Sequence, residues 1–271
     1  MSDPEPKQDD ELVSMSLMEH LTELRNRIGI IFIAFVILFF LCFIRPFGGG
    51  TFNAADYVYF WLQAPLAEIL FERGGRMIFT GLHEGFFTQV KVAFFISICI
   101  TFPLILVQVW RFVAPGLYRN ERSAFMPFLL ATPILFVLGA AMVYYLVIPL
   151  AWDFFLSFEM VGGEGTLPIE VEPRISEYLS LVMRLMFAFG VSFELPVVLL
   201  LLTKAGIVTP NGLARNRKYA ILIAFIAAAI LTPPDVISQV MLAIPVILLY
   251  EMSIVGARFV YKNNDYEDSI D

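Results

Sequence analysis

Apolar residues gather in four long runs that polar segments separate. The runs cover residues 28–44, 86–109, 124–148 and 176–203, and the shortest contains 17 residues. A helix needs roughly 17 to 25 mostly apolar residues to cross the hydrocarbon core of a bilayer, which is about 30 Å thick. The pattern therefore predicts four transmembrane helices in an all-α membrane protein.

Two shorter apolar runs follow near the C-terminus. They cover 219–231 and 240–250, with 13 and 11 residues, and end at Thr232 and Glu251. The Pro-Pro-Asp sequence at 233–235 predicts a tight turn between them. Two short spans that thin the bilayer, or a re-entrant hairpin, would both return the chain to the same side. We expect a polytopic bundle of six helices in which the last two are short.

The segment before the first run has the pattern of an amphipathic helix. In 12–27, leucines recur at helical spacing, while charged residues such as Glu23 and Arg27 occupy other faces. We expect this helix to lie at the membrane interface and to lead straight into the first span. Glu23 precedes Arg27 by four residues, which is the favourable order for a helical ion pair.

Composition and charge agree with a membrane protein. Hydrophobic residues make up 59% of the chain and charged residues 16%, with a mean hydropathy of +0.77, whereas a soluble domain carries roughly 25% charged residues. The net charge of −7 comes from residues 1–11, with −4, and residues 262–271, with −3. Nothing in the chain is basic enough to indicate nucleic-acid binding.

Lysine and arginine are distributed unequally between the two sides of the predicted topology. Twelve lie in segments on the side of the N-terminus and four on the opposite side, which holds the two longest loops, 45–85 and 149–175. Because basic loops stay in the cytoplasm, both termini are expected there. The chain then divides into a cytoplasmic tail with the amphipathic helix (1–27), a six-helix transmembrane domain (28–257) and an acidic cytoplasmic tail (258–271).

One carboxylate lies deep inside a predicted span. Glu194 is nine residues from Thr203, about 13 Å at 1.5 Å per residue, and an unpaired carboxylate there costs several kcal/mol. Pro196 cannot donate to the carbonyl of Ser192, so we expect the helix to bend beside the carboxyl group. A hydrogen bond that holds two helices together and a functional polar patch both explain Glu194.

Other polar residues have ordinary interpretations on their own. Glu121 stands in a short basic loop and Gln108 near a span end, where water satisfies both. Lys91 and Arg184 lie inside spans, and their long stems are expected to reach the interface. A proline follows Lys91 after 12 residues, and another follows Arg184 after 12 residues. This equal spacing is a faint sign of an internal repeat.

Catalytic and energy-converting motifs are missing from the sequence. It contains no His-Glu-x-x-His, Gly-x-Ser-x-Gly or phosphate-binding Gly-x-x-x-x-Gly-Lys motif, and its two histidines are His20 and His83. We therefore expect no enzyme activity, no cofactor and no metal site. A secondary transporter of a small solute is the alternative function, supported by the faint repeat alone.

Four blocks of sequence resemble the TatC family of the twin-arginine protein translocase. They are Glu-His-Leu-Thr-Glu-Leu-Arg-Asn-Arg at 19–27, the stretch from Phe-Phe at 86–87 through Gln-Val-Trp-Arg-Phe-Val-Ala-Pro-Gly-Leu-Tyr at 108–118 to Glu-Arg at 121–122, Ala-Phe-Gly-Val-Ser-Phe-Glu-Leu-Pro at 188–196, and Leu-Thr-Pro-Pro-Asp-Val-Ile-Ser-Gln at 231–239. The blocks stand in the family's order. The resemblance implies the six-span layout with both ends inside.

The resemblance also implies a receptor that performs no covalent chemistry. Its ligands would be the paired arginines of export signals on folded substrates, and the matching binding residues are Glu23 and Glu121, with Leu21, Arg25 and Phe112 beside them. A carboxylate accepts a planar guanidinium in bidentate fashion, which lysine cannot reproduce.

The family further implies the setting in which such a receptor works. The setting is the bacterial cytoplasmic (inner) membrane, with membrane lipid around the protein and with transport driven by the proton-motive force. Intramembrane polar residues, here Glu194, Asp235 and Gln239, would contact the single-span partners TatA and TatB. Other copies of the chain are further expected partners.

Overall fold

The computed structural model describes residues 17–44, 52–113, 126–159, 171–232 and 236–267. These residues form helices and no strand, and Ile78 and Arg174 make an isolated bridge. In chain order the helices are α1 (Leu17–Leu41), α2 (Ala54–Arg73), α3 (Glu84–Val113), α4 (Met126–Met142), the π-helical turn η3 (Val143–Val147), α5 (Ile148–Leu156), α6 (Ile175–Ser192), α7 (Leu195–Lys204), α8 (Pro210–Arg215), α9 (Arg217–Leu231) and α10 (Val236–Glu267).

Five helical segments are long and apolar enough to cross a membrane. They are Met18–Leu41, Glu84–Val109, Leu130–Leu156, Ile175–Lys204 and Gln239–Tyr261. The prediction of an all-α polytopic protein is therefore confirmed. Helix α9 has 15 residues, about 22 Å at 1.5 Å per residue, so a sixth crossing stays a prediction.

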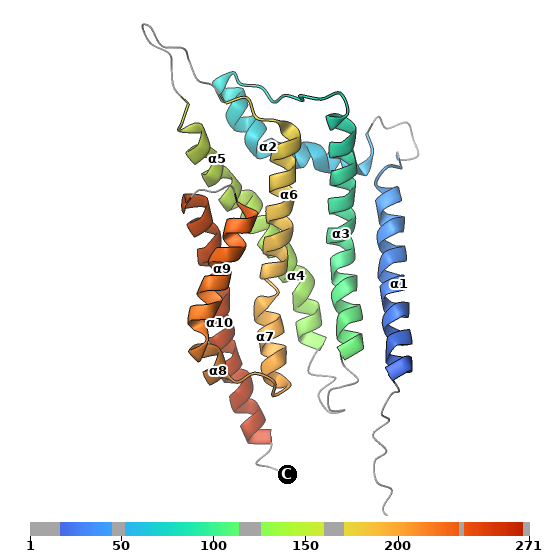
Figure 1. Cartoon of the computed structure of the whole chain (residues 1–271), viewed down its shortest axis with the longest axis vertical. Helices are drawn as coiled ribbons and strands as arrows, with labels where there is room; N and C mark the ends of the chain where they lie inside the picture. The colour runs from blue at the N-terminus through green and yellow to red at the C-terminus, as the bar shows by residue number, and fades with distance from the viewer. Residues whose placement is uncertain (1–16, 45–51, 114–125, 160–170, 233–235, 268–271) are drawn as a thin grey trace, which may run out of the picture.

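The helices form an upright bundle with one helix laid across an end (Figure 1). Helix α2 lies at the top of this view, and we call this end of the bundle the α2 end. Helix α1 begins and helix α10 ends at the opposite end, which we call the terminal end. Helix α1 runs without a break through residue 27, so residues 17–27 of the amphipathic segment lead straight into the first span, as predicted. Their position at the membrane interface stays a prediction.

The prediction that 45–85 is a loop is wrong, because α2 occupies much of it. The side chain of Asn53 accepts a hydrogen bond from the N–H of Asp56, and the Asp56 carboxylate accepts one from the N–H of Asn53, both at 2.9 Å. This capping box begins the helix. Gly74 ends it in the left-handed conformation, with φ 71°.

A proline inside α2 creates the contact that fixes this helix to the bundle. Pro65 has no N–H, so the carbonyl of Trp61 lacks its helical donor. The Tyr144 hydroxyl donates to that carbonyl at 2.7 Å, and the Tyr178 hydroxyl donates to the carbonyl of Leu62 at 2.9 Å. Two tyrosines from η3 and α6 therefore hold the middle of α2.

The third span is also longer than the apolar run 124–148 predicts. It continues through η3 and α5 to Leu156, inside the region expected to be a loop. The N–H of Ile148 donates to the carbonyl of Val143, five residues back, and this wider turn lets the helix pass Pro149 without ending.

Helix α10 contradicts the prediction of a short last helix. It contains 32 residues and passes through Glu251, where the apolar run stops. Arg217 at the start of α9 donates to both oxygens of the Glu251 carboxylate, at 2.7 and 3.0 Å. Because a charged residue with such a partner does not interrupt a helix, the last apolar run underestimates the length of α10.

Two glycines allow α4 and α6 to pack closely. A Cβ atom on Gly139 would lie 2.5 Å from the carbonyl oxygen of Phe189, and one on Gly190 would lie 2.5 Å from the ring of Phe136. Phe136 and Phe189 are themselves buried. Any larger residue at Gly139 would push the two backbones apart.

Candidate functional site

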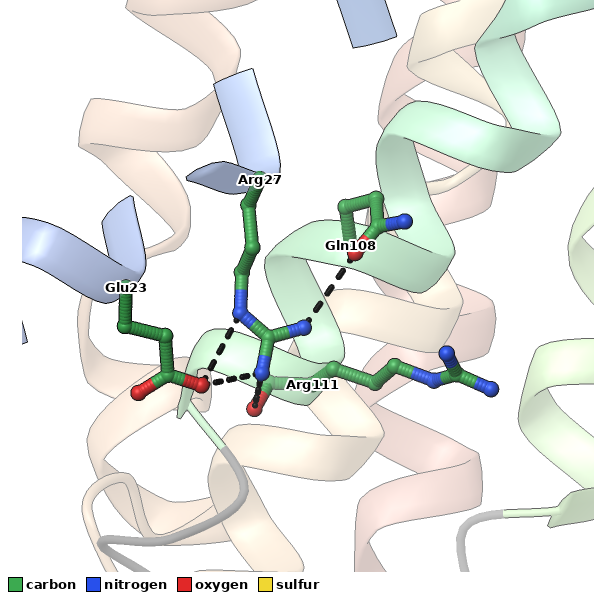
Figure 2. A network of polar contacts seen from close by, with 4 residues as sticks. All are labelled: Glu23, Arg27, Gln108 and Arg111. Carbon is green, nitrogen blue, oxygen red and sulfur yellow. Dashed lines mark hydrogen bonds and ion pairs between the residues drawn. The ribbon is translucent and has the colours of Figure 1, made fainter. Parts of the chain in front are cut away.

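A polar network joins α1 to α3 near the terminal end of the bundle (Figure 2). The Nε atom of Arg27 donates to Oε1 of Glu23 at 3.1 Å, and Nη2 contacts the same oxygen. The guanidinium also donates to Oε1 of Gln108 at 3.2 Å and to the carbonyl of Arg111 at 3.1 Å. The predicted ion pair between Glu23 and Arg27 is confirmed, and it reaches across to a second helix.

Only one oxygen of the Glu23 carboxylate takes part in this network. The other, Oε2, is buried and has no hydrogen-bond partner among the described residues, and Figure 2 shows it on the side away from Arg27. A buried polar atom without a partner costs roughly 1 to 3 kcal/mol. Glu23 therefore holds an acceptor that a further donor would stabilise.

The other residues predicted near Glu23 divide into two groups. The ring of Phe112 stacks on that of His20, with centroids 4.2 Å apart, and so links the end of α3 to the start of α1. Leu21 and Arg25 are exposed and lie on the open surface of α1. Glu121 lies outside the described residues.

Gln108 is the functional candidate that sequence reasoning missed. Its side chain is 7% exposed and bonds to Arg27 from a helix 81 positions further along the chain. An amide buried near the end of an apolar span needs a hydrogen-bond partner. This requirement could have indicated from the sequence that Gln108 contacts another helix. The ordinary interpretation of Gln108 as a residue that water satisfies is wrong.

Glu194 occupies the break between α6 and α7. Helix α6 ends at Ser192 and α7 begins at Leu195, with Pro196 in its first turn, so the predicted bend is confirmed. Glu194 is 4% exposed, and its carboxyl group is hydrogen-bonded to the side chain of Thr132 on α4. Its Oε1 atom is buried without a partner among the described residues.

Gln239, the other described residue of the predicted intramembrane group, has a main-chain partner. Its Nε2 atom donates to the carbonyl of Phe225 at 3.1 Å, which ties α10 to α9. No hydrogen bond between described residues joins Gln239 to Glu194. Asp235 lies outside the described residues.

These features define a class of protein. Membrane-length helices and a helix laid across one end are the features of a polytopic helical membrane protein, and two of its carboxylates each keep a buried oxygen without a partner among the described residues.

Comparison with known proteins then supplies the family. The family described as "Sec-independent protein translocase protein (TatC)" matches residues 19–245. The TatC of Magnetococcus marinus is 48% identical over 253 residues, which cover 93% of this chain and 88% of the relative. The TatC of Escherichia coli K12 is 41% identical over 243 residues, covering 90% of this chain and 88% of the relative. The chain belongs to the TatC family of Sec-independent protein translocases.

A solved structure confirms the fold. The crystal structure of a twin-arginine translocase receptor, TatC, superposes with a TM-score of 0.75 at 40% identity, covering 89% of this chain and 99% of that one. The chain is thus a multi-pass membrane component of a protein translocase and not an enzyme. The alternative function, a secondary transporter of small solutes, receives no support from these relatives.

Proposed function

We propose that this chain is the receptor for twin-arginine signal peptides and the core subunit of a translocase that exports folded proteins. The main support is the likeness, at 40% identity, to a solved twin-arginine translocase receptor over nearly that receptor's whole length. Transport would use the proton-motive force across the bacterial cytoplasmic membrane.

The chemistry of Glu23 suits the recognition of arginine. Oε2 of Glu23 is a carboxylate oxygen without a donor among the described residues, at the terminal end of the bundle. A guanidinium offers several N–H groups in one plane and forms short, charge-assisted hydrogen bonds with a carboxylate. Glu23 would accept one arginine of the signal and Glu121 the other, while Leu21, Arg25 and Phe112 would contact the flanking residues.

The charge distribution supports an orientation with the terminal end in the cytoplasm. Three arginines of the α2 end are each paired with an acid: Arg73 with Glu159 at 3.1 Å, Arg76 with Glu172 at 2.9 Å, and Arg174 with Glu177 at 3.1 Å. The basic residues near the terminal end outnumber them. By the positive-inside rule, we expect both chain ends to lie in the cytoplasm.

The intramembrane polar residues would serve the partner subunits. Glu194 has a buried carboxylate oxygen without a described donor at a break in the helix, which a polar group on a neighbouring single-span helix would satisfy. We assign Glu194, Asp235 and Gln239 to contacts with TatA and TatB, and we expect other copies of the chain in the same assembly. In this scheme, Glu194→Gln leaves signal binding intact and lowers export.

Binding of a synthetic signal peptide to the full chain in detergent tests the proposal. A peptide with Arg-Arg should bind, while the same peptide with Lys-Lys should bind at least about tenfold more weakly. Glu23→Gln should weaken binding of the Arg-Arg peptide about 10- to 150-fold, because a hydrogen bond to a charged group contributes roughly 1.5 to 3 kcal/mol.

The control for this experiment lies on the same helix. Glu19→Gln makes the same charge change four residues earlier, at an exposed position, and should leave the affinity unchanged. Equal affinity for both peptides, or equal affinity of Glu23→Gln and the wild type, would refute the receptor assignment of Glu23.

A further inference from the structure

Two cationic side chains lie within the spans near the α2 end. Lys91 follows the start of α3 by seven residues and Arg184 follows the start of α6 by nine, which places them about 10 and 14 Å along their helices. Both side chains are exposed on the surface of the bundle. A cation at this depth needs water, an anion or a path to the interface.

The two cations belong to one patch of surface between α3 and α6. The Nζ atom of Lys91 donates to the Ser180 hydroxyl of α6 at 3.2 Å. Arg184 lies four residues after Ser180, and residues at this spacing are neighbours on one helix face. The Lys91 ammonium therefore lies about one helical turn from the base of the Arg184 side chain.

No carboxylate among the described residues neutralises this pair. Glu84, two turns before Lys91, accepts hydrogen bonds from the N–H and the hydroxyl of Thr80, at 2.9 and 2.6 Å. Glu177, two turns before Arg184, is paired with Arg174 at 3.1 Å. The acids nearest along the two helices are thus engaged elsewhere, and the patch carries two positive charges.

The surface around the patch is apolar and open. On α3, Phe87 and Phe94 lie one turn to either side of Lys91, on the same face, and are 54% and 51% exposed. Two cations flanked by exposed rings on a membrane-spanning face are complementary to a molecule with one anionic group and hydrocarbon chains.

We infer that Lys91 and Arg184 form a binding site for the phosphate group of an anionic phospholipid from the leaflet at the α2 end. The lipid phosphate accepts hydrogen bonds from the ammonium and the guanidinium, and its acyl chains cover Phe87 and Phe94. Long cationic side chains reach toward the interface, so both charged groups meet the phosphate above their own Cα positions. A zwitterionic lipid fits less well, because the two side-chain cations would repel the cationic group of its headgroup.

Native mass spectrometry of the full chain in neutral detergent, titrated with phosphatidylglycerol, tests this site. The wild type should retain phosphatidylglycerol in preference to phosphatidylcholine. The double variant Lys91→Met/Arg184→Met should bind phosphatidylglycerol roughly thirtyfold more weakly, since each cation near an anionic membrane surface contributes a factor of about five.

Two further variants make the result specific. Arg73→Met/Arg76→Met removes two cations at the same end that are already paired with acids, and should leave lipid binding unchanged. The exchange Lys91→Arg/Arg184→Lys keeps both charges and should keep the site, which covers the case in which the double methionine variant fails to fold.

Three outcomes would overturn the inference. They are equal retention of the two lipids by the wild type, undiminished phosphatidylglycerol binding in a folded double methionine variant, and an equal loss in the Arg73/Arg76 control. Inorganic phosphate at the lipid's concentration should not displace the lipid; displacement would show a site for free phosphate and not for a phospholipid.

Discussion

Replacing Arg27 by methionine removes the guanidinium that fastens α1 to α3 while keeping most of the aliphatic stem. The change deletes the bonds to Glu23, to the amide of Gln108 and to the carbonyl of Arg111. Helix α1 is sensitive to this loss, because no residue in its most apolar window is fully buried. The contacts of Arg27 therefore add to partly exposed apolar contacts, such as the ring of Phe35 against that of Phe94 on α3.

The expected cost follows from the geometry of the pair. The side chains of Arg27 and Glu23 are 18% and 22% exposed, so the pair is intermediate between a surface ion pair and a buried one. A surface pair contributes 0 to about 1 kcal/mol, and disrupting a buried pair costs about 3 to 5 kcal/mol. We expect Arg27→Met to lower the free energy of unfolding by about 2 to 3 kcal/mol. Much of this is the cost of leaving the Glu23 carboxylate without its cation.

A double-mutant cycle separates that cost from the loss of packing. Glu23→Gln removes the negative charge, so the double variant Glu23→Gln/Arg27→Met should lose about 1.5 kcal/mol less than the sum of the two single variants. Arg27→Lys should fall between wild type and Arg27→Met, because an ammonium cannot reach three acceptors in one plane.

The assay is unfolding of the wild type and the four variants in mixed detergent micelles, followed by circular dichroism. A coupling energy below about 0.5 kcal/mol would mean that the two changes are additive. The ion pair would then contribute nothing to the attachment of α1, and its role as a link between α1 and α3 would have to be abandoned.

Three further changes test the packing of the bundle by thermal unfolding. Tyr144→Phe should cost about 1 to 2 kcal/mol because it orphans a carbonyl of α2 that no helical N–H can reach, whereas Tyr145→Phe, at a 71% exposed position, should be neutral. Gly139→Ala should cost about 1 to 3 kcal/mol by forcing α4 from α6, while Gly29→Ala, where an added Cβ meets nothing within 4 Å, should not destabilise; equal effects would contradict the close approach. Asn53→Ala should cost about 1 kcal/mol through loss of the α2 cap, and an unchanged melting temperature would show that tertiary contacts alone hold α2.

Missed elements share a feature: their cause lies in a distant residue or in local polar geometry. The predicted loop 45–85 contains α2, although Asn53 and Asp56 are residues typical of a helix start and Gly74 of a helix end. In the sequence, Glu251 interrupts the last apolar run and suggests that the helix ends there. In the structure it pairs with Arg217, which lies 34 positions earlier, so the helix continues. Whether a charged residue interrupts a membrane helix depends on its partner, and only the fold brings together partners that lie far apart along the chain.

The sequence by itself determined that the chain is an all-helical membrane protein, roughly where four of its five long spans lie and that one of these four bends near Glu194. These are local properties. Whether a segment crosses the membrane depends on its own length and apolar composition, and a proline disturbs the helix in which it lies. The tertiary structure decided that Arg27 engages Gln108, that Tyr144 holds α2, and that Lys91 and Arg184 share one surface. Hydrogen bonds and ion pairs act over about 3 Å, so which groups they join depends on helix packing that a linear pattern does not contain.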